Sequence, residues 1–413
     1  MRMNRFLKQG PNVLFPQFFA RSLAFIAVSS SVLANDNTDL ETLKRDLASL
    51  QDQLASSQQS SWADTITIGG LIQGDTRLFE GGQNDIDNLL IRRARIDIRG
   101  VVSDSVSFRI LPEFSDGNDN GHLLDAYVDI RHNANISWRI GKFKSPVGIE
   151  RVQSVPRLSF IERGLTDNLV PNRDVGIALT YQASAFAGTV GVANNAGDRQ
   201  DTDIDNDNGK ALFWRLFWQT PLNGLGVGTS GSVGHTDNNS SLPTYKSSGR
   251  STIFSYADNV VRDGDEHRLA AHAMWYRGQF GSFAEYVVSE TSLLNDAGTR
   301  LTAQNTGWQM VASWMLTGEQ NAWSDITPSD GSGAWELLLR VSELTIDQDV
   351  FTHFASPANA VAGANSVAVG LSWYVSPHIK VLTNYEHTSF SSFTGGDVRS
   401  SEKLLSARLQ LFY

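Results

Sequence analysis

Apolar and polar residues alternate along most of this chain. From residue 63 to the C-terminus the alternation has a period of two, which is typical of β-strands with one apolar and one polar face. Val367, Val369, Leu371 and Trp373, for example, are separated by small or polar residues. The pattern fits a barrel with lipid outside and water inside, and it also fits a soluble sandwich whose apolar faces point inward.

The alternation predicts about sixteen strands, many of them long enough to cross a bilayer at a tilt. They cover approximately residues 65–77, 88–100, 104–114, 122–132, 135–144, 173–182, 185–194, 209–220, 225–236, 265–277, 278–290, 305–317, 333–346, 366–376, 377–390 and 401–413. Aromatic residues near strand ends are expected to form girdles at the membrane interfaces, namely Trp138, Trp275, Tyr276, Trp308 and Tyr374. A β-propeller would show one sequence repeat per blade, and we find no such repeat.

Short turns and long loops tend to alternate between these strands. Long polar loops are expected at residues 145–172, 195–208, 237–264, 291–304 and 347–365. The link at 318–332 departs from the alternation, because it is long where a short turn is expected. Tight periplasmic turns and longer outer loops are typical of outer-membrane barrels. Strand length and loop asymmetry therefore favour the transmembrane barrel over the sandwich.

Both ends of the chain point to export. Residues 1–34 combine four basic residues with a short apolar run that ends at Ala34, which fits a secretory signal peptide. An uncleaved anchor helix is the alternative, although the apolar run is short for a membrane span. The C-terminal sequence SARLQLFY at 406–413 alternates and ends on an aromatic residue, as is common in chains inserted by the bacterial outer-membrane assembly machinery.

Residues 35–62 have a different pattern. Leucines recur there at spacings of three and four, which predicts a coiled-coil seam about two heptads long. A seam this short is not stable as a lone helix. Two interpretations remain open: a short coiled coil that helps the chain to oligomerise, or a linker helix that frays.

The composition narrows the classes of function. The 413-residue chain has no cysteine, which excludes disulfide scaffolds and thiolate sites. Its formal net charge is −10, and removal of the basic leader would leave −14, so we expect no nucleic-acid partner. No apolar run is long enough for a membrane-spanning helix. The sequence also predicts no cofactor and no metal, because His267 and His272 would lie on opposite faces of a strand.

Arginines are concentrated in a few strands in spite of the negative net charge. The stretch RRARIDIRG at 92–100 places Arg93, Arg95 and Arg99 on one face of a strand. In a barrel this face would line the lumen, where the planar guanidinium fork fits oxyanions. The alternative is that the arginines brace the wall, because Asp97 and other lumen carboxylates can pair with them across strands. Both interpretations remain open at this point.

Several segments, taken in order and spacing, resemble the phosphate-selective porin O and P family. They are RRARIDIRG at 92–100, WRIGKFKSPVGIER at 138–151, LSFIERGLTDNLVPNRDVGIAL at 158–179, AGTVGVANNAGD at 187–198, SWMLTGE at 313–319, WELLLRVSELTID at 335–347 and VGLSWYVSPHIKVLTNYEH at 369–387. The resemblance covers residues 63–413. It implies an all-β, transmembrane antiparallel β-barrel of about sixteen strands, assembled as a homotrimer, with the third loop folded into the pore.

The resemblance also implies a passive porin in the bacterial outer membrane that passes small, phosphate-like anions and contacts outer-membrane lipids. In such a pore, arginines and lysines attract the anion. The residues that we assign to the anion pathway are Arg92, Arg93, Arg95, Arg99, Lys142, Lys144, Arg151, Arg157, Arg163, Arg215 and Arg268.

One departure from the family concerns the substrate. Phosphate-selective members carry alternating arginines in or beside the long fifth outer loop, whereas residues 251–272 hold Arg262 and Arg268 among four carboxylates. The resemblance thus supports the porin fold better than phosphate selectivity. The alternatives are a weakly selective porin for small hydrophilic solutes, a plugged structural or adhesive barrel, and a barrel enzyme. The last would need a nucleophile and a base at the rim, and no motif such as G-x-S-x-G is present.

Overall fold

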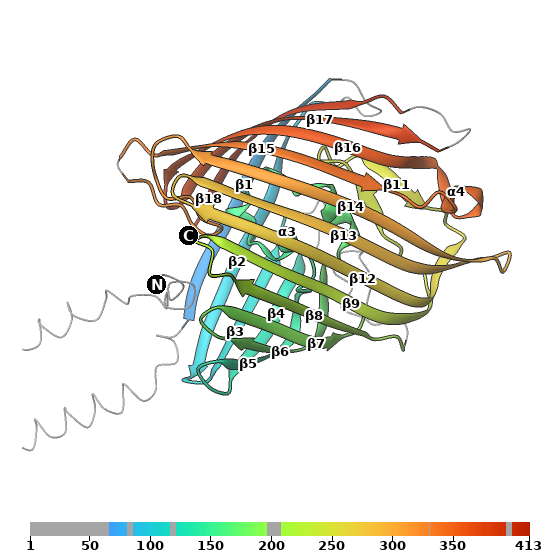
Figure 1. Ribbon diagram of the computed structural model, residues 1–413, viewed down its shortest axis with the longest axis horizontal. Coiled ribbons are helices and arrows are strands. Elements are labelled where there is room, and N and C mark those ends of the chain that lie inside the picture. The colour runs from blue at the N-terminus through green and yellow to red at the C-terminus, as the bar shows by residue number, and fades with distance from the viewer. Residues whose placement is uncertain (1–65, 81–85, 116–120, 196–207, 330, 394–398) are drawn as a thin grey trace, which may run out of the picture. The chain divides into compact units, whose positions relative to one another are not determined.

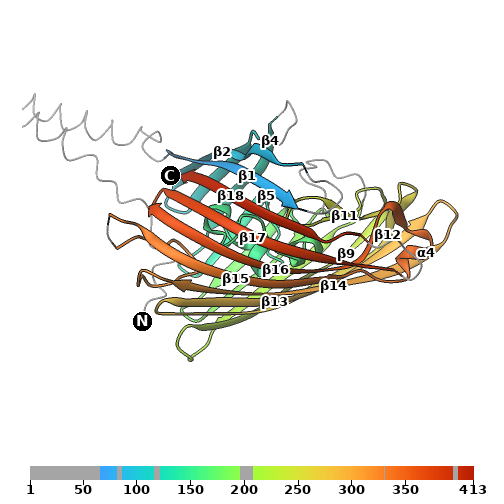
Figure 2. The same cartoon turned by 90° about the horizontal axis from the view of Figure 1, so that it is seen from above.

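The alternating side chains build one closed, antiparallel β-barrel (Figures 1 and 2). The structure, a computed structural model, describes residues 66–80, 86–115, 121–195, 208–329, 331–393 and 399–413. The predicted signal peptide at 1–34 and the predicted helix at 35–62 lie outside these residues. Among the described residues, no helix is both long enough and apolar enough to cross a membrane.

The wall of the barrel consists of sixteen strands in the described part of the chain. They are β1 (Ile66–Glu80), β2 (Asn88–Ser103), β3 (Val106–Glu113), β4 (His122–Arg131), β5 (Ile136–Lys144), β6 (Arg173–Gln182), β7 (Phe186–Ala193), β8 (Ala211–Gln219), β9 (Leu225–Asn239), β12 (Val260–Arg277), β13 (Phe280–Asn295), β14 (Arg300–Met315), β15 (Ala334–Thr345), β16 (Ala355–Ser376), β17 (Ile379–Ser392) and β18 (Glu402–Phe412). Each strand pairs with its neighbour in the sequence, except that β9 pairs with β12. The ring closes where β18 pairs antiparallel with β1, and these two strands lie side by side in Figure 2.

The C-terminal aromatic residue takes part in this closure. The backbone N–H of Tyr413 donates to the carbonyl oxygen of Gly70 at 3.2 Å, and the N–H of Gly70 donates to the carbonyl oxygen of Tyr413 at 3.2 Å. A closed ring leaves no strand edge exposed, which a sheet in a lipid bilayer requires.

Each of the predicted strands has a counterpart, but three of the predicted loops are more ordered than expected. Much of the loop predicted at 347–365 belongs to β16, which begins at Ala355. The loop at 237–264 contains β10 (Thr244–Lys246) and β11 (Thr252–Tyr256), which pair with each other, and β11 also pairs with β16. The predicted loop at 291–304 is mostly strand, because β13 and β14 continue to Asn295 and from Arg300. Polar residues on both faces of these extensions hide the period of two.

The apolar faces point outward, as the alternation predicts. Leu212 and Val367 are 44% and 50% exposed, which is the position of lipid-facing side chains in a barrel of this kind. The girdle prediction is only partly correct. Trp138 is exposed on the outer face, but Tyr276 and Tyr374 point inward, because both occupy the polar phase of their strands. The hydroxyl of Tyr374 donates to Glu336 at 2.7 Å.

The loop between β5 and β6, residues 145–172, lies inside the barrel and is called the pore loop below. It contains α3 (Ile149–Val152), which Figure 1 shows among the strands, and the short 3₁₀ segments η3 (Val155–Arg157) and η4 (Leu165–Leu169). Phe160 packs in an apolar cluster with Phe283 of β13 and Leu338 of β15, which face the lumen. The in-folded third loop implied by the family resemblance is therefore confirmed.

Part of the lumen is filled by an apolar core. Leu165 and Leu169 of the pore loop pack with Phe254 of β11 and with Val287 and Leu344 of the wall, all fully buried. The short helix α4 (Val350–His353) contributes Val350 to the same cluster. The interior is thus not uniformly polar. Exposed polar side chains of the lumen lie on the wall formed by β2–β6.

Candidate pore lining

A single carboxylate holds the pore loop to β1, β2 and β18. Glu162 accepts from Nε of Arg92 at 2.6 Å and from Nη2 of Arg77 at 2.9 Å, and Arg93 and Arg408 each lie 3.6 Å away. These four arginines are called the arginine nest. Burial alone would raise the pKa of Glu162, but the positive charges of the nest outweigh it and hold that pKa well below its usual range.

The nest changes the role that the sequence suggested for two arginines. Arg92 and Arg93 are bound to a loop carboxylate, and Arg93 also donates to Gln73 at 2.7 Å. Asp75 completes the nest by pairing with Arg408 at 2.6 Å and with Arg77 at 3.1 Å. The sequence reasoning missed Arg77, Arg408 and Glu162, although the inward phase of β1 and β18 was a signal for the first two.

Two buried carboxylates dock the other side of the pore loop. Nε2 of Gln309 in β14 donates to Glu150 of the loop at 3.0 Å and to Glu285 of β13 at 3.3 Å. Glu285 also accepts from the backbone N–H of Ile149 and from the hydroxyl of Thr166 at 3.2 Å. Burial raises the pKa of the Glu150 carboxyl. The loop is therefore fixed to the wall at β13–β15 as well as at the nest.

Arginines and aspartates alternate along the wall that faces the loop. Arg99 pairs with Asp97 at 2.7 Å, Arg109 pairs with Asp97 at 2.7 Å and with Asp125 at 2.9 Å, and Arg173 pairs with Asp125 at 2.6 Å. These five residues, on β2, β3, β4 and β6, are called the charge ladder. Three of its four pairs cross from strand to strand, as the wall-bracing interpretation expects, whereas Arg99 and Asp97 both lie on β2.

Two further arginines on this wall also pair with a carboxylate on the neighbouring strand. Arg95 pairs with Glu113 at 2.6 Å. Arg139 pairs with Asp129 at 2.7 Å, and its guanidinium lies 3.8 Å from the ring centroid of Tyr127. The side chains of Arg99 and Arg139 keep 62% and 38% exposure, so bracing does not remove them from the water in the lumen.

Cations of the pore loop and of the adjoining end of β5 face the charge ladder. Nζ of Lys144 donates to the carbonyl oxygens of Arg151 at 3.1 Å and Gln153 at 2.9 Å. Arg163 donates to the carbonyl oxygen of Glu150 at 3.0 Å, and both Arg151 and Arg163 share the carboxylate of Asp167, at 3.0 and 3.6 Å. Lys144, Arg151, Arg163 and Asp167 are called the loop cluster. Arg163 and Arg173 are near enough to Lys144 to act electrostatically on it, which places this cluster beside the ladder.

The other residues that the sequence assigns to the anion pathway lie outside these groups. Arg157 pairs with Asp325 at 2.6 Å in the link between β14 and β15. Arg215 lies 3.4 Å from the carbonyl oxygen of Gly148 in the pore loop. Lys142 and Arg268 are buried, and neither belongs to the charge ladder or the loop cluster.

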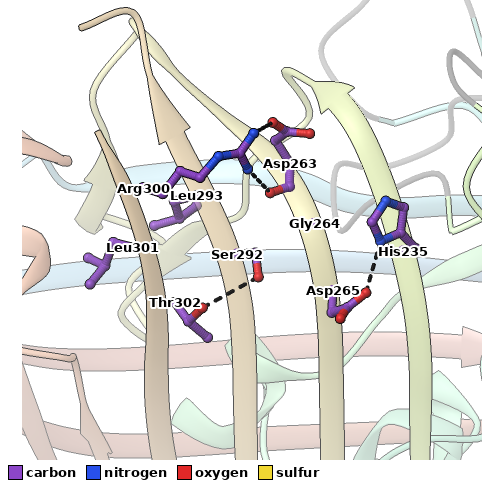
Figure 3. Close-up of a pocket in the computed structure, with 9 residues that line it drawn as sticks. All are labelled: His235, Asp263, Gly264, Asp265, Ser292, Leu293, Arg300, Leu301 and Thr302. Carbon is purple, nitrogen blue, oxygen red and sulfur yellow. Dashed lines mark hydrogen bonds and ion pairs between the residues drawn. The ribbon is translucent and has the colours of Figure 1, made fainter. Parts of the chain in front are cut away.

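A pocket of about 320 Å³ lies away from this lining, on the outer face of the barrel between β9, β12, β13 and β14 (Figure 3). Its charged side chains pair with each other: Arg300 with Asp263 at 2.7 Å, and His235 with Asp265 at 2.8 Å. Within the described residues, no group of three or more histidine and acidic side chains could hold a metal ion. The cations that face the lumen therefore remain the candidate functional site.

The comparisons with known proteins agree with this fold. The phosphate-selective porin O and P family matches residues 66–413. The chain belongs to this family. Comparison with curated proteins found no match. Membership establishes a porin channel of the bacterial outer membrane.

Solved structures of other porins share the fold at low sequence identity. The outer-membrane channel DcaP of Acinetobacter baumannii has 14% identity and a TM-score of 0.57, covering 84% of this chain and 97% of that chain. An anion-selective porin from Comamonas acidovorans has 12% identity and a TM-score of 0.54, covering 84% and 99%. The trimer form of OmpT from Vibrio cholerae has 11% identity and a TM-score of 0.53, covering 84% and 99%.

Proposed function

We propose that this porin passes small anions passively between the pore loop and the wall formed by β2–β6. The observation that carries the proposal is the excess of cations along that path. Eight cationic side chains of the ladder, the loop cluster and their neighbours stand against five carboxylates. An excess of one sign in a narrow, low-dielectric channel raises the local concentration of the counter-ion.

The pairing of these arginines bears on which anions pass. Arg95, Arg109 and Arg139 already direct their guanidinium forks at carboxylates, so an incoming phosphate would have to compete for them. Several moderate sites in series let an ion enter and leave, whereas one deep site would trap it. The geometry therefore favours a weakly selective channel for small anions, phosphate among them, over a dedicated phosphate channel.

Reversal potentials in planar bilayers under a potassium chloride gradient test the proposal. The wild type is expected to prefer chloride, and the double variant Lys144→Gln with Arg163→Gln is expected to lose most of that preference. Arg300→Gln is the matched control, because Arg300 forms its ion pair on the outer wall. Cation preference in the wild type would refute the proposal, and a conductance near zero would favour the plugged, structural barrel.

We propose further that the protein is a homotrimer embedded among outer-membrane lipids. The support comes from the family resemblance and from the trimeric form of the similar OmpT structure. The exposed apolar residues of the outer face are suited to lipid. Native mass spectrometry of the detergent-extracted protein is expected to give three copies, and a stable monomer would contradict the assignment.

A further inference from the structure

The link between β14 and β15, residues 316–333, is unusual for its end of the barrel. It has eighteen residues, whereas the other turns at this end have two to five. We call it the long turn. The sequence marked part of it as a misfit, and the structure gives the reason: the long turn folds back and contacts the pore loop.

Several contacts give the long turn a defined shape. The backbone N–H of Asn321 donates to the carbonyl oxygen of Gly278 at 2.7 Å, and its side-chain amide donates to the hydroxyl of Ser313 at 2.7 Å. Ile326 packs with Met315 and Ala334, at the ends of the two flanking strands. These contacts fix the turn to β12–β15 before any contact with the pore loop is counted.

Two residues of the long turn contact the pore loop directly. Asp325 accepts two hydrogen bonds from the guanidinium of Arg157, at 2.7 and 2.6 Å. The carbonyl oxygen of Trp323 accepts from the side-chain amide of Gln153 at 3.2 Å. The Trp323 ring packs edge-on against Phe283 at 5.2 Å, the residue that also packs with Phe160 of the loop.

We propose that Asp325 and Trp323 are positioning residues for the pore loop, and that the long turn acts as a strap across its η3 segment. The η3 segment has three residues, so its own helical hydrogen bonds do not fix its place. Both partners of the Arg157–Asp325 pair are over 40% exposed. An exposed pair adds little stability, so its main effect is geometric. The strap holds the loop at a set distance from the charge ladder.

The inference rests on the proposed channel function, and two variants with opposite charge effects test it. Asp325→Asn and Arg157→Gln both remove the strap contact, but one removes a negative charge and the other a positive charge. Single-channel recordings should show that each raises open-channel current noise severalfold, while their reversal potentials move in opposite directions. The charge-exchanged double variant Arg157→Asp with Asp325→Arg should restore a quiet current.

Asp263→Asn is the matched control, since Asp263 pairs with Arg300 at 2.7 Å on the outer wall. It should leave noise and selectivity unchanged. Hydrogen exchange of residues 153–158 in detergent gives a second readout, which should speed up severalfold in Asp325→Asn and not in the control. Quiet currents and unchanged exchange in a conducting protein would overturn the strap, whereas a wild type without conductance would overturn the channel proposal instead.

Discussion

Glu162 is one of the side chains that fix the position of the 28-residue pore loop. It neutralises part of a nest of four arginines whose side chains are at most 14% exposed. We predict that Glu162→Gln lowers the free energy of unfolding by about 3–5 kcal/mol, because it leaves buried like charges uncompensated. Urea unfolding in detergent measures the change. Glu80→Gln, at the exposed pair with Lys403, is the control and should have almost no effect.

The same carboxyl gives the loop a defined response to pH. Because the pKa of Glu162 is held below its usual range, its stabilising charge is complete above about pH 4.3 and is lost as the pH falls through the lower folded value. We predict quiet open-channel currents from neutral pH down to about pH 5 and rising noise only in stronger acid. Glu162→Gln should give noisy currents already at neutral pH, and a quiet current in this variant would contradict the assignment of Glu162 as an anchor of the loop.

At the scale of elements, β10 and β11 carry a cluster of aromatic side chains, called the lid below, that packs against the pore loop and the wall. Phe254 is fully buried, with ring centroids of Tyr245, Tyr256 and Phe351 at 5.5, 5.0 and 6.0 Å. We predict that Phe254→Ala weakens this packing by about 3–5 kcal/mol and raises the unit conductance, because the lid can move away from the wall. Leu337→Ala, on the outer face of the barrel, should not change the conductance.

The elements also show which part of the structure could be predicted from the sequence. The period of two located the strands and the direction of their faces, because successive side chains of a strand point alternately to the outer face and to the lumen. It did not reveal β10 and β11, which are short and belong to the loop between β9 and β12. Contacts across long sequence separations were also out of reach: nothing in the periodicity of residues 92–100 links Arg92 to Glu162, 70 residues away.

The sequence predicted which types of residue line the candidate site. It did not predict which carboxylate each arginine pairs with. The arginine-rich face of β2 does face the lumen, where Arg99 stays exposed. The choice between guiding anions and bracing the wall depended on which carboxylates lie opposite, and the sequence left that open. In the structure the two interpretations are compatible, because Arg139 on β5 pairs across strands with Asp129 on β4 and its side chain is still 38% exposed.

For the whole molecule, the distribution of charge matters more than its sum. The chain carries a formal net charge of −10, yet the inner path has an excess of cations. Anion preference that arises from such a field should weaken as salt screens it, because the Debye length falls from about 10 Å at 0.1 M to about 3 Å at 1 M. We predict a marked drop in the chloride preference over this range, measured as reversal potentials at a constant gradient ratio.

The double variant Lys144→Gln with Arg163→Gln tests whether the chloride preference arises from the electrostatic field of the cations along the path. If the preference is electrostatic, the variant should show a small salt dependence, because Lys144 and Arg163 of the loop cluster supply two of the positive charges along the path. Arg300→Gln on the outer wall should keep the full salt dependence of the wild type. A wild-type preference that persists undiminished at 1 M salt would instead indicate direct binding of the ion to desolvated guanidinium groups, since contacts at hydrogen-bond distance are screened far less than a long-range field.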